Sequence, residues 1–157
     1  MENKEIIIDV LTVANILSMA GKELLCNVVE NYNVNQNEYY LLRYLEKNPG
    51  EIQYNFLKFT TLTKSRINQI VSKLEKMGYL EKKSEMTGGL LKKPLYLTKL
   101  GEMVVKEGVE KIYDNTIKNF NEKEIFQYET YRNEMVEILT NMKLIFGIRT
   151  PKYLEEK

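Results

Sequence analysis

The most constraining feature of the sequence is a single amphipathic segment, residues 63–78. Its apolar residues recur at helical spacing along one side, and they are Ile67, Ile70, Val71, Leu74 and Met77. Thr63 precedes them at a position where its hydroxyl caps a helix, and Gly78 follows them where helices commonly end in a left-handed conformation. The segment is therefore predicted to be a helix of defined length with one buried face.

The other face of this predicted helix is polar, and Glu75 is its only acid. Amides, hydroxyls and cations contact base edges and phosphates in DNA complexes. We expect Asn68 and Gln69 to contact base edges, because an amide bonds adenine through two hydrogen bonds, and Arg66 to contact guanine or a phosphate. The predicted DNA-contacting residues of this helix are Thr63, Lys64, Ser65, Arg66, Asn68, Gln69, Ser72, Lys73 and Lys76.

A basic hairpin is predicted directly after this helix. Residues 79–83 and 90–97 read as two short strands joined by a long loop, with Gly88 and Gly89 at its tip. Lys92 and Lys93 on this arm are added to the predicted DNA contacts. A short helix is predicted at residues 54–59, so the local order is helix, turn, helix, hairpin. That is the plan of a winged helix-turn-helix.

Positive charge is concentrated in the same part of the chain. Residues 58–99 contain ten Lys or Arg and three Glu, a net charge of +7, whereas residues 1–57 carry −4 and residues 100–157 carry −2. A local basic surface on a nearly neutral body is typical of nucleic-acid-binding domains. A solvated lysine-rich face is the alternative explanation. The coincidence of the charge with a capped helix and a hairpin favours DNA binding.

Capping signals predict three further helices. Asn35 and Glu38 form a capping box before the second helix, and Thr98 caps the helix that follows the hairpin. Asn121 and Glu124 form another capping box before the last long helix.

The first and last helices are predicted to be long and apolar. Residues 6–29 and 125–145 both carry apolar side chains at three- and four-residue spacing. One chain has little surface with which to cover both stripes, and contiguous exposed apolar surface usually marks an interface. We therefore expect a two-fold dimer formed by the terminal helices, which would place two recognition helices about one turn of DNA apart.

The composition argues against several classes of protein. There is no His, and the single Cys, Cys26, forms no internal disulfide, so we expect no metal, no cofactor and a reducing cytoplasm. No Gly-rich phosphate loop and no carboxylate pair at a motif spacing is present, so we expect no enzyme. No apolar run approaches the ~20 residues that a membrane span needs.

Residues 6–145 resemble the multiple-antibiotic-resistance regulator (MarR) family. The resemblance rests on residues 35–42, on residues 63–80 with their pattern Thr63-x-Ser65-x-Ile67, and on Leu97-Thr98-x-x-Gly101. It implies a homodimeric transcriptional regulator, most simply a repressor on a palindromic operator. Its recognition helix would enter the major groove and its wing the minor groove. It also implies release of DNA by a small, often aromatic or anionic, effector.

The wing departs from the family pattern. Relatives usually carry aspartate-x-arginine there, and residues 85–93 contain no arginine. Lys92 and Lys93 are the cations available for the same role, and lysine lacks the planar fork with which arginine binds.

Tyrosines suggest a candidate effector site, because the chain has eleven of them and no tryptophan. A cleft lined by tyrosines between helices would accept an aromatic effector. The candidate lining residues are Tyr39, Tyr40, Tyr44 and Tyr113. Aromatic residues at helical spacing are more often part of a core or an interface, and this alternative stays open.

The expected fold class is mostly α with a small β-hairpin wing (α+β). Residues 1–157 are expected to form one unit, with 6–34 and 102–147 as dimerisation helices and 35–101 as the winged helix-turn-helix. The expected partners are duplex DNA, a second copy of the chain and an effector. Two alternatives remain: a winged helix used for protein contact, replication or plasmid partition, and a redox- or ligand-sensing switch in which DNA binding is secondary.

Overall fold

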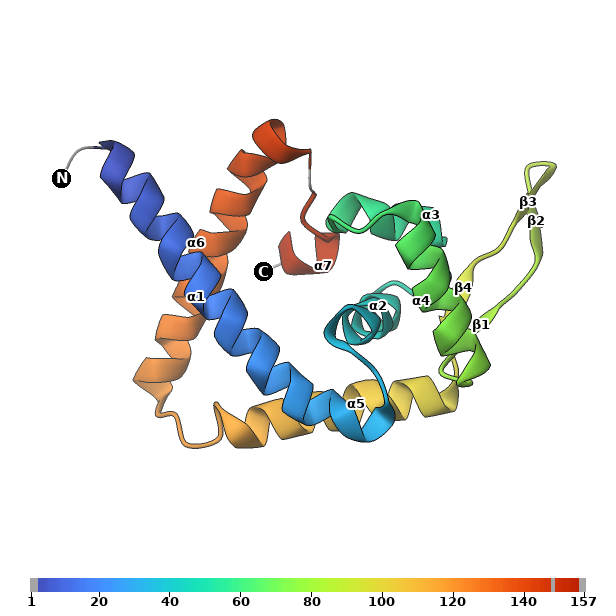
Figure 1. Ribbon diagram of the computed structural model, residues 1–157, viewed down its shortest axis with the longest axis horizontal. Coiled ribbons are helices and arrows are strands. Elements are labelled where there is room, and N and C mark those ends of the chain that lie inside the picture. The colour runs from blue at the N-terminus through green and yellow to red at the C-terminus, as the bar shows by residue number, and fades with distance from the viewer. Residues whose placement is uncertain (1–2, 148, 156–157) are drawn as a thin grey trace.

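The computed structural model describes residues 3–147 and 149–155, and it is mostly helical with one small β-arm (Figure 1). The expected fold class is confirmed. In chain order the elements are α1 (Asn3–Val29), the 3₁₀ helix η1 (Glu30–Tyr32), α2 (Gln36–Lys47), α3 (Gln53–Phe56), the 3₁₀ helix η2 (Leu57–Phe59), α4 (Lys64–Lys76), β1 (Leu80–Lys82), β2 (Glu85–Thr87), β3 (Leu90–Lys92), β4 (Leu95–Leu97), α5 (Lys99–Asn115), α6 (Glu122–Phe146) and α7 (Lys152–Glu155).

The core lies where α2, α4, α5 and the base of the β-arm meet. Leu42, Val71, Leu74 and Val104 have no exposed surface there. Burying a side chain of this size stabilises the fold by about 1.5–3 kcal/mol. The apolar stripe predicted for residues 63–78 is the buried face of α4, so the amphipathic pattern determines which side of this helix faces solvent.

The predicted helix caps are present. The side chain of Asn35 accepts from the amide of Glu38, whose carboxylate accepts in return from the amide of Asn35, and Asn121 forms the same reciprocal pair with Glu124. Each such cap satisfies amides that the helix itself leaves unpaired. These interactions are local, which explains why the sequence alone predicts them.

The β-arm consists of two short ladders, and we call residues 80–97 the wing. β1 pairs with β4 at its base, and β2 pairs with β3 at its tip, both antiparallel. The prediction of two strands joined by a long loop is therefore wrong, because most of that loop is itself paired. Gly88 and Gly89 form the tip with φ of 58° and 78°, which only glycine adopts readily at consecutive positions.

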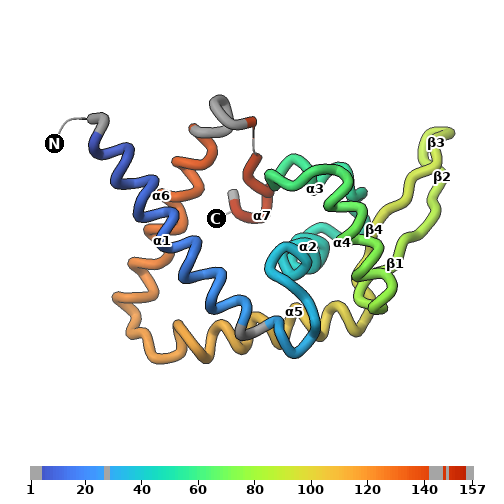
Figure 2. The backbone as a smooth tube through the Cα atoms, viewed as in Figure 1, coloured from blue at the N-terminus to red at the C-terminus, as the bar shows by residue number. Residues whose placement is uncertain are grey.

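The terminal helices lie at the opposite end of the molecule from the wing (Figures 1 and 2). α5 runs along one side and connects the wing to α6, while α1 packs on α5 and α2. In the described part of the chain, no helix combines the length and the apolarity that crossing a membrane requires.

A short C-terminal segment, residues 149–155, was not predicted and packs against the helix-turn-helix. The Arg149 amide donates to the carbonyl of Lys58 at 2.8 Å, and the Arg132 guanidinium donates to the carbonyl of Leu154 at 2.8 Å. Tyr153 of α7 lies half-buried against the core. The segment thus links α6 to η2 through contacts between residues far apart in sequence.

Candidate nucleic-acid interface

The polar face of α4 lies at the surface. Thr63, the N-cap, accepts from the Arg66 amide at 3.2 Å, and this cap sets where the helix begins. The predicted contact residues are exposed except for Ser72 and Lys73, which are half-buried, and the exposed ones are Thr63, Lys64, Ser65, Arg66, Asn68, Gln69 and Lys76. The wing residues Lys92 and Lys93 are exposed as well.

Two open grooves border this face. The helix groove, of about 700 Å³, is lined by Asn33, Ser65, Asn68, Gln69, Ser72, Lys73, Lys76 and Met77. The wing groove, of about 530 Å³, is lined by Ile52, Gln53, Tyr54, Asn68, Lys82, Leu91, Lys92 and Lys93. Asn68 borders both, so the structure brings the predicted recognition face and the predicted wing lysines to one continuous surface.

Hydrogen bonds hold the central side chains of this face in place. Arg66 donates through Nη1 to Oε1 of Gln69 at 3.0 Å. Gln53 on α3 donates to Oδ1 of Asn68 at 2.6 Å. Both bonds lie at the surface, where a base edge or phosphate can exchange with them. They orient the three side chains predicted to read sequence.

Lys73 differs from the other predicted contacts. Its Nζ lies 2.8 Å from Oε2 of Glu38 on α2 and 2.9 Å from the carbonyl of Asn33. The Glu38 side chain is only 4% exposed, and Lys73 supplies the cation that faces it. Lys73 therefore fixes α4 against the start of α2, and its charge is less available to a phosphate than we expected.

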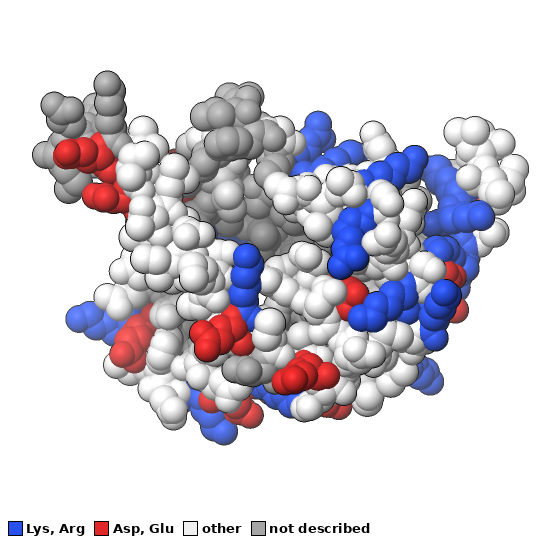
Figure 3. Space-filling model, in the orientation of Figure 1, with Lys and Arg blue, Asp and Glu red and all other residues white. Residues whose placement is uncertain are grey.

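Four other cations among the predicted contacts form no such ion pair in the part of the chain that the structure describes. Within residues 3–147 and 149–155, the ammonium groups of Lys64, Lys76, Lys92 and Lys93 form no ion pair, and all four side chains are exposed. In Figure 3 the largest gathering of Lys and Arg covers the end of the molecule that holds α3, α4 and the wing.

A tight joint fixes the wing base against α4. The Thr98 hydroxyl donates to the carbonyl of Gly78 at 2.5 Å and also accepts from the amide of Gly101 at 3.1 Å. A Cβ at Gly101 would lie 2.0 Å from the carbonyl oxygen of Tyr79, so a larger residue cannot fit there without backbone movement. The Leu97-Thr98-x-x-Gly101 pattern thus joins the start of α5 to the end of α4.

A second joint connects this unit to α1 and α5. The Tyr79 hydroxyl donates to the carbonyl of Tyr32 in η1 at 3.0 Å, and the Tyr32 hydroxyl donates to the carboxylate of Glu107 on α5. The hydrogen bond to Glu107 raises the pKa of Tyr32 to about 12. Tyr32 therefore joins the connection between α1 and α2 to both α5 and the end of α4.

The wing groove has three polar or aromatic lining residues that were not predicted as contacts: Gln53, Tyr54 and Lys82. Lys82 is part of the basic stretch that the charge count detects, and it pairs with Glu75 at 2.7 Å. Gln53 and Tyr54 carry no local sequence signal, because their position beside Asn68 depends on how α3 packs on α4.

The four tyrosines proposed to line an effector site lie in two different environments. Tyr39 and Tyr44 are buried: Tyr39 donates to the carbonyl of Val105 at 3.2 Å, and the ring of Tyr44 lies 5.3 Å from that of Phe56. Burial raises the pKa of both phenols. Tyr40 and Tyr113 are each 48% exposed. The buried pair serves the core, which is the alternative the sequence left open.

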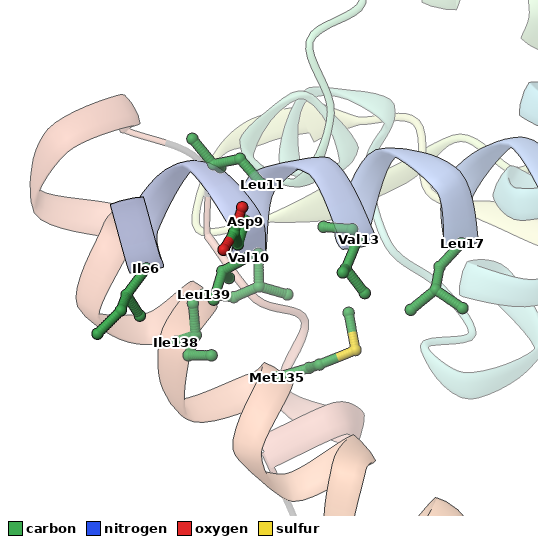
Figure 4. A pocket seen from close by; sticks show the side chains of 10 residues that line it. Ile6, Asp9, Val10, Leu11, Val13, Leu17, Met135, Ile138 and Leu139 are labelled. Atoms are coloured by element: carbon green, nitrogen blue, oxygen red, sulfur yellow. The ribbon is translucent and has the colours of Figure 1, made fainter. Parts of the chain in front are cut away.

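At the other end of the molecule, α1 and α6 border an apolar cleft of about 470 Å³. Figure 4 shows Val10, Val13 and Leu17 of α1 directed toward Met135 and Ile138 of α6. Many apolar side chains of both helices stay exposed, among them Leu17 at 54% and Leu139 at 48%.

Comparison with known proteins rests on structure, since no family model and no curated protein sequence matches this chain. A MarR family protein from Bacillus stearothermophilus superposes with a TM-score of 0.70 at 16% identity, covering 89% of this chain and 99% of that one. Wild-type MarR from E. coli gives 0.65 at 11% identity, covering 80% and 95%. This chain has the MarR fold.

A third similar structure contains nucleic acid. A mutant of S. aureus MepR bound to an oligodeoxyribonucleotide superposes with a TM-score of 0.56 at 16% identity, covering 82% of this chain and 96% of that one. The similarity to structures with the MarR fold thus extends over most of this chain.

Proposed function

We propose that the chain is a sequence-specific, duplex-DNA-binding transcriptional regulator of the MarR family that acts in the cytoplasm. The observation that carries the proposal is the polar face of α4, on which Arg66, Asn68 and Gln69 are exposed and Asn68 borders both grooves. Amide and guanidinium groups of this kind read base edges in the major groove. The DNA-bound MepR relative supports the same use of the fold.

Phosphate contacts are assigned to the cations without partners in the described residues. Lys64, Lys76, Lys92 and Lys93 are exposed and free of ion pairs there, so they lose little when they bind phosphate. Lys73 has a second role besides phosphate contact: its ion pair with Glu38 holds α4 against α2. Thr63, Ser65 and Ser72 supply hydroxyls to the same face.

The proposed assembly is a homodimer in which α1 and α6 of two copies pack together. The support is the exposed apolar surface on both helices, which one chain leaves uncovered. A two-fold dimer reads a palindrome, because each half-site meets one recognition helix. Residues 6–34 and 102–147 form the dimerisation part and residues 35–101 the DNA-binding part.

Repression is the proposed sign of regulation, with release by a small aromatic or anionic effector. Among the four candidate tyrosines, the exposed pair, Tyr40 and Tyr113, is accessible to such a molecule. Titration of the protein–DNA complex with simple aromatic carboxylates tests this part separately.

Selection of bound sequences from random duplex DNA tests the central proposal. We expect enrichment of one palindrome whose half-sites are about one helical turn apart. Arg66→Ala and Gln69→Ala should each weaken binding to that palindrome by more than about 1 kcal/mol, while non-specific binding changes less. A protein that enriches no sequence and ignores duplex DNA would instead be a winged helix used for protein contact.

A further inference from the structure

The tip of the wing exposes large apolar side chains. Met86, Leu90 and Leu91 are 70%, 69% and 62% exposed, although leucine and methionine favour burial. In Figure 3 this tip projects as an uncharged end beyond the gathering of Lys and Arg. An apolar cluster at the end of a projecting arm lies too far out to pack in the core of its own chain. Such exposed apolar surface indicates that a partner binds there.

The register of the tip ladder makes both faces of the ribbon apolar near its end. Met86 lies opposite Leu91, so these two side chains share one face, and Leu90, opposite Thr87, lies on the other face. Gly88 and Gly89 make the turn short, with φ of 58° and 78°. The ribbon is therefore narrow, and its apolar end at Leu90 lies two residues from Lys92, the last residue of β3.

A second copy of the chain is a poor match for this tip. The apolar surfaces of α1 and α6 lie at the opposite end of the molecule from the wing (Figures 1 and 2). A dimer formed there leaves both wing tips uncovered.

The surroundings of the tip favour duplex DNA. Leu91 lines the wing groove together with Lys92 and Lys93, and Asn68 of α4 borders the same groove. Glu85, the acid of the β2–β3 ladder, accepts a hydrogen bond from the Tyr96 hydroxyl at 3.1 Å. A DNA duplex that contacts α4 through one groove and these lysines through its phosphates therefore has its neighbouring groove at the apolar tip.

We propose that Met86, Leu90 and Leu91 form an apolar wedge that enters the minor groove, partly unstacks one base step and bends the duplex. This rests on the DNA binding proposed above. Apolar side chains inserted between bases kink DNA and allow it to wrap more protein surface. The step would be a flexible pyrimidine–purine step, since these unstack most easily. Lysine lacks the planar fork with which arginine binds, and in this wing the apolar wedge supplies the minor-groove contact instead.

The test compares two variants of the full-length chain on the palindrome obtained by selection. Leu90→Ser combined with Leu91→Ser removes the apolar end, and Lys93→Gln is the matched control that removes a phosphate contact on the same arm. All positions are exposed, so an unchanged melting temperature is expected for both proteins. DNA bending is measured by energy transfer between the duplex ends, and unstacking by 2-aminopurine fluorescence at the predicted step.

The wedge predicts opposite patterns for the two variants. The double serine variant should lose most of the bend and the fluorescence increase, and bind about tenfold more weakly, with an unchanged salt dependence. Lys93→Gln should keep the bend and lower the salt slope by about one per subunit. Wild-type bending and fluorescence in the double serine variant overturn the wedge but leave DNA binding intact. Failure of the wild-type chain to bind any duplex overturns both proposals.

Discussion

The two ends of this molecule use apolar residues in opposite ways. The core of the helix-turn-helix buries apolar side chains completely at Leu42, Val71 and Leu74, whereas α1 and α6 leave Leu17 and Leu139 about half exposed. Both ends have helical periodicity, so the pattern alone does not separate them. The difference lies in what covers each stripe: neighbouring elements of the same chain cover the first, and we propose that a second copy covers the other.

Replacing a buried leucine should have the largest effect on the folding of the first end. Leu74→Ala should lower the free energy of unfolding by about 2–5 kcal/mol, because it leaves a cavity between α4 and the rest of the core. Urea denaturation followed by circular dichroism measures this. Leu90→Ala on the exposed wing is the control and should change stability by less than about 0.5 kcal/mol. Equal losses in the two variants would contradict the assigned core.

A charge on the α1 surface should have its main effect on association. Leu17→Asp places a carboxylate in the cleft beside α6 and should weaken self-association about 100-fold, or ~2.7 kcal/mol. Sedimentation equilibrium measures the change. Asn15→Asp adds the same charge to the same exposed helix and should have a smaller effect. If Leu17→Asp dimerises like the wild type, the interface lies elsewhere.

Two glycines should respond in opposite directions. Gly101→Ala brings a Cβ against the backbone of Tyr79 and should destabilise the fold by about 1–3 kcal/mol. Gly21 in α1 has open space around its Cβ position, so Gly21→Ala should stabilise by about 0.5–1 kcal/mol through helix propensity. Thermal unfolding distinguishes the two. Stabilisation by both substitutions would show that the joint between α4 and α5 is loose.

Removing the Tyr32 hydroxyl should have the smallest effect. Tyr32→Phe loses the bond to Glu107 and should cost less than about 1 kcal/mol near neutral pH, because solvent screens this partly exposed pair. The folded-state pKa of about 12 exceeds the ordinary value of 10.0. The stabilisation is therefore complete below pH 10 and is lost as the pH rises toward 12. Urea denaturation between pH 10 and 12 should show that the free energy of unfolding falls less with pH in the variant than in the wild type. If the two proteins lose stability in parallel over this range, the assignment is contradicted.

The features that the sequence predicts correctly are local ones. The boxes at Asn35–Glu38 and Asn121–Glu124 and the cap at Thr63 involve residues three apart, so spacing determines them. The buried face of α4 follows from periodicity for the same reason. These signals suffice for the order of the long helices and for the exposed polar face of α4.

The features that the sequence misses depend on contacts between distant residues. The partner of Lys73 is Glu38, 35 positions away, and Asn68 meets Gln53 only because α3 packs on α4. The tip ladder of the wing has no buried face, so its strands lack the alternation by which strands are detected. Residues 149–155 dock on η2 through backbone atoms, which carry no sequence signal.

The salt dependence of binding to duplex DNA tests the central claim most directly. If two copies of the α4 face and wing bind duplex DNA through six to ten phosphate contacts, affinity for the selected palindrome should fall about 10³–10⁵-fold between ~50 and ~200 mM salt. Combined replacement of Lys64, Lys76, Lys92 and Lys93 by Gln should flatten that dependence. A wild-type affinity that does not change with salt, or the absence of duplex binding at low salt, would contradict the claim that this cationic surface binds DNA.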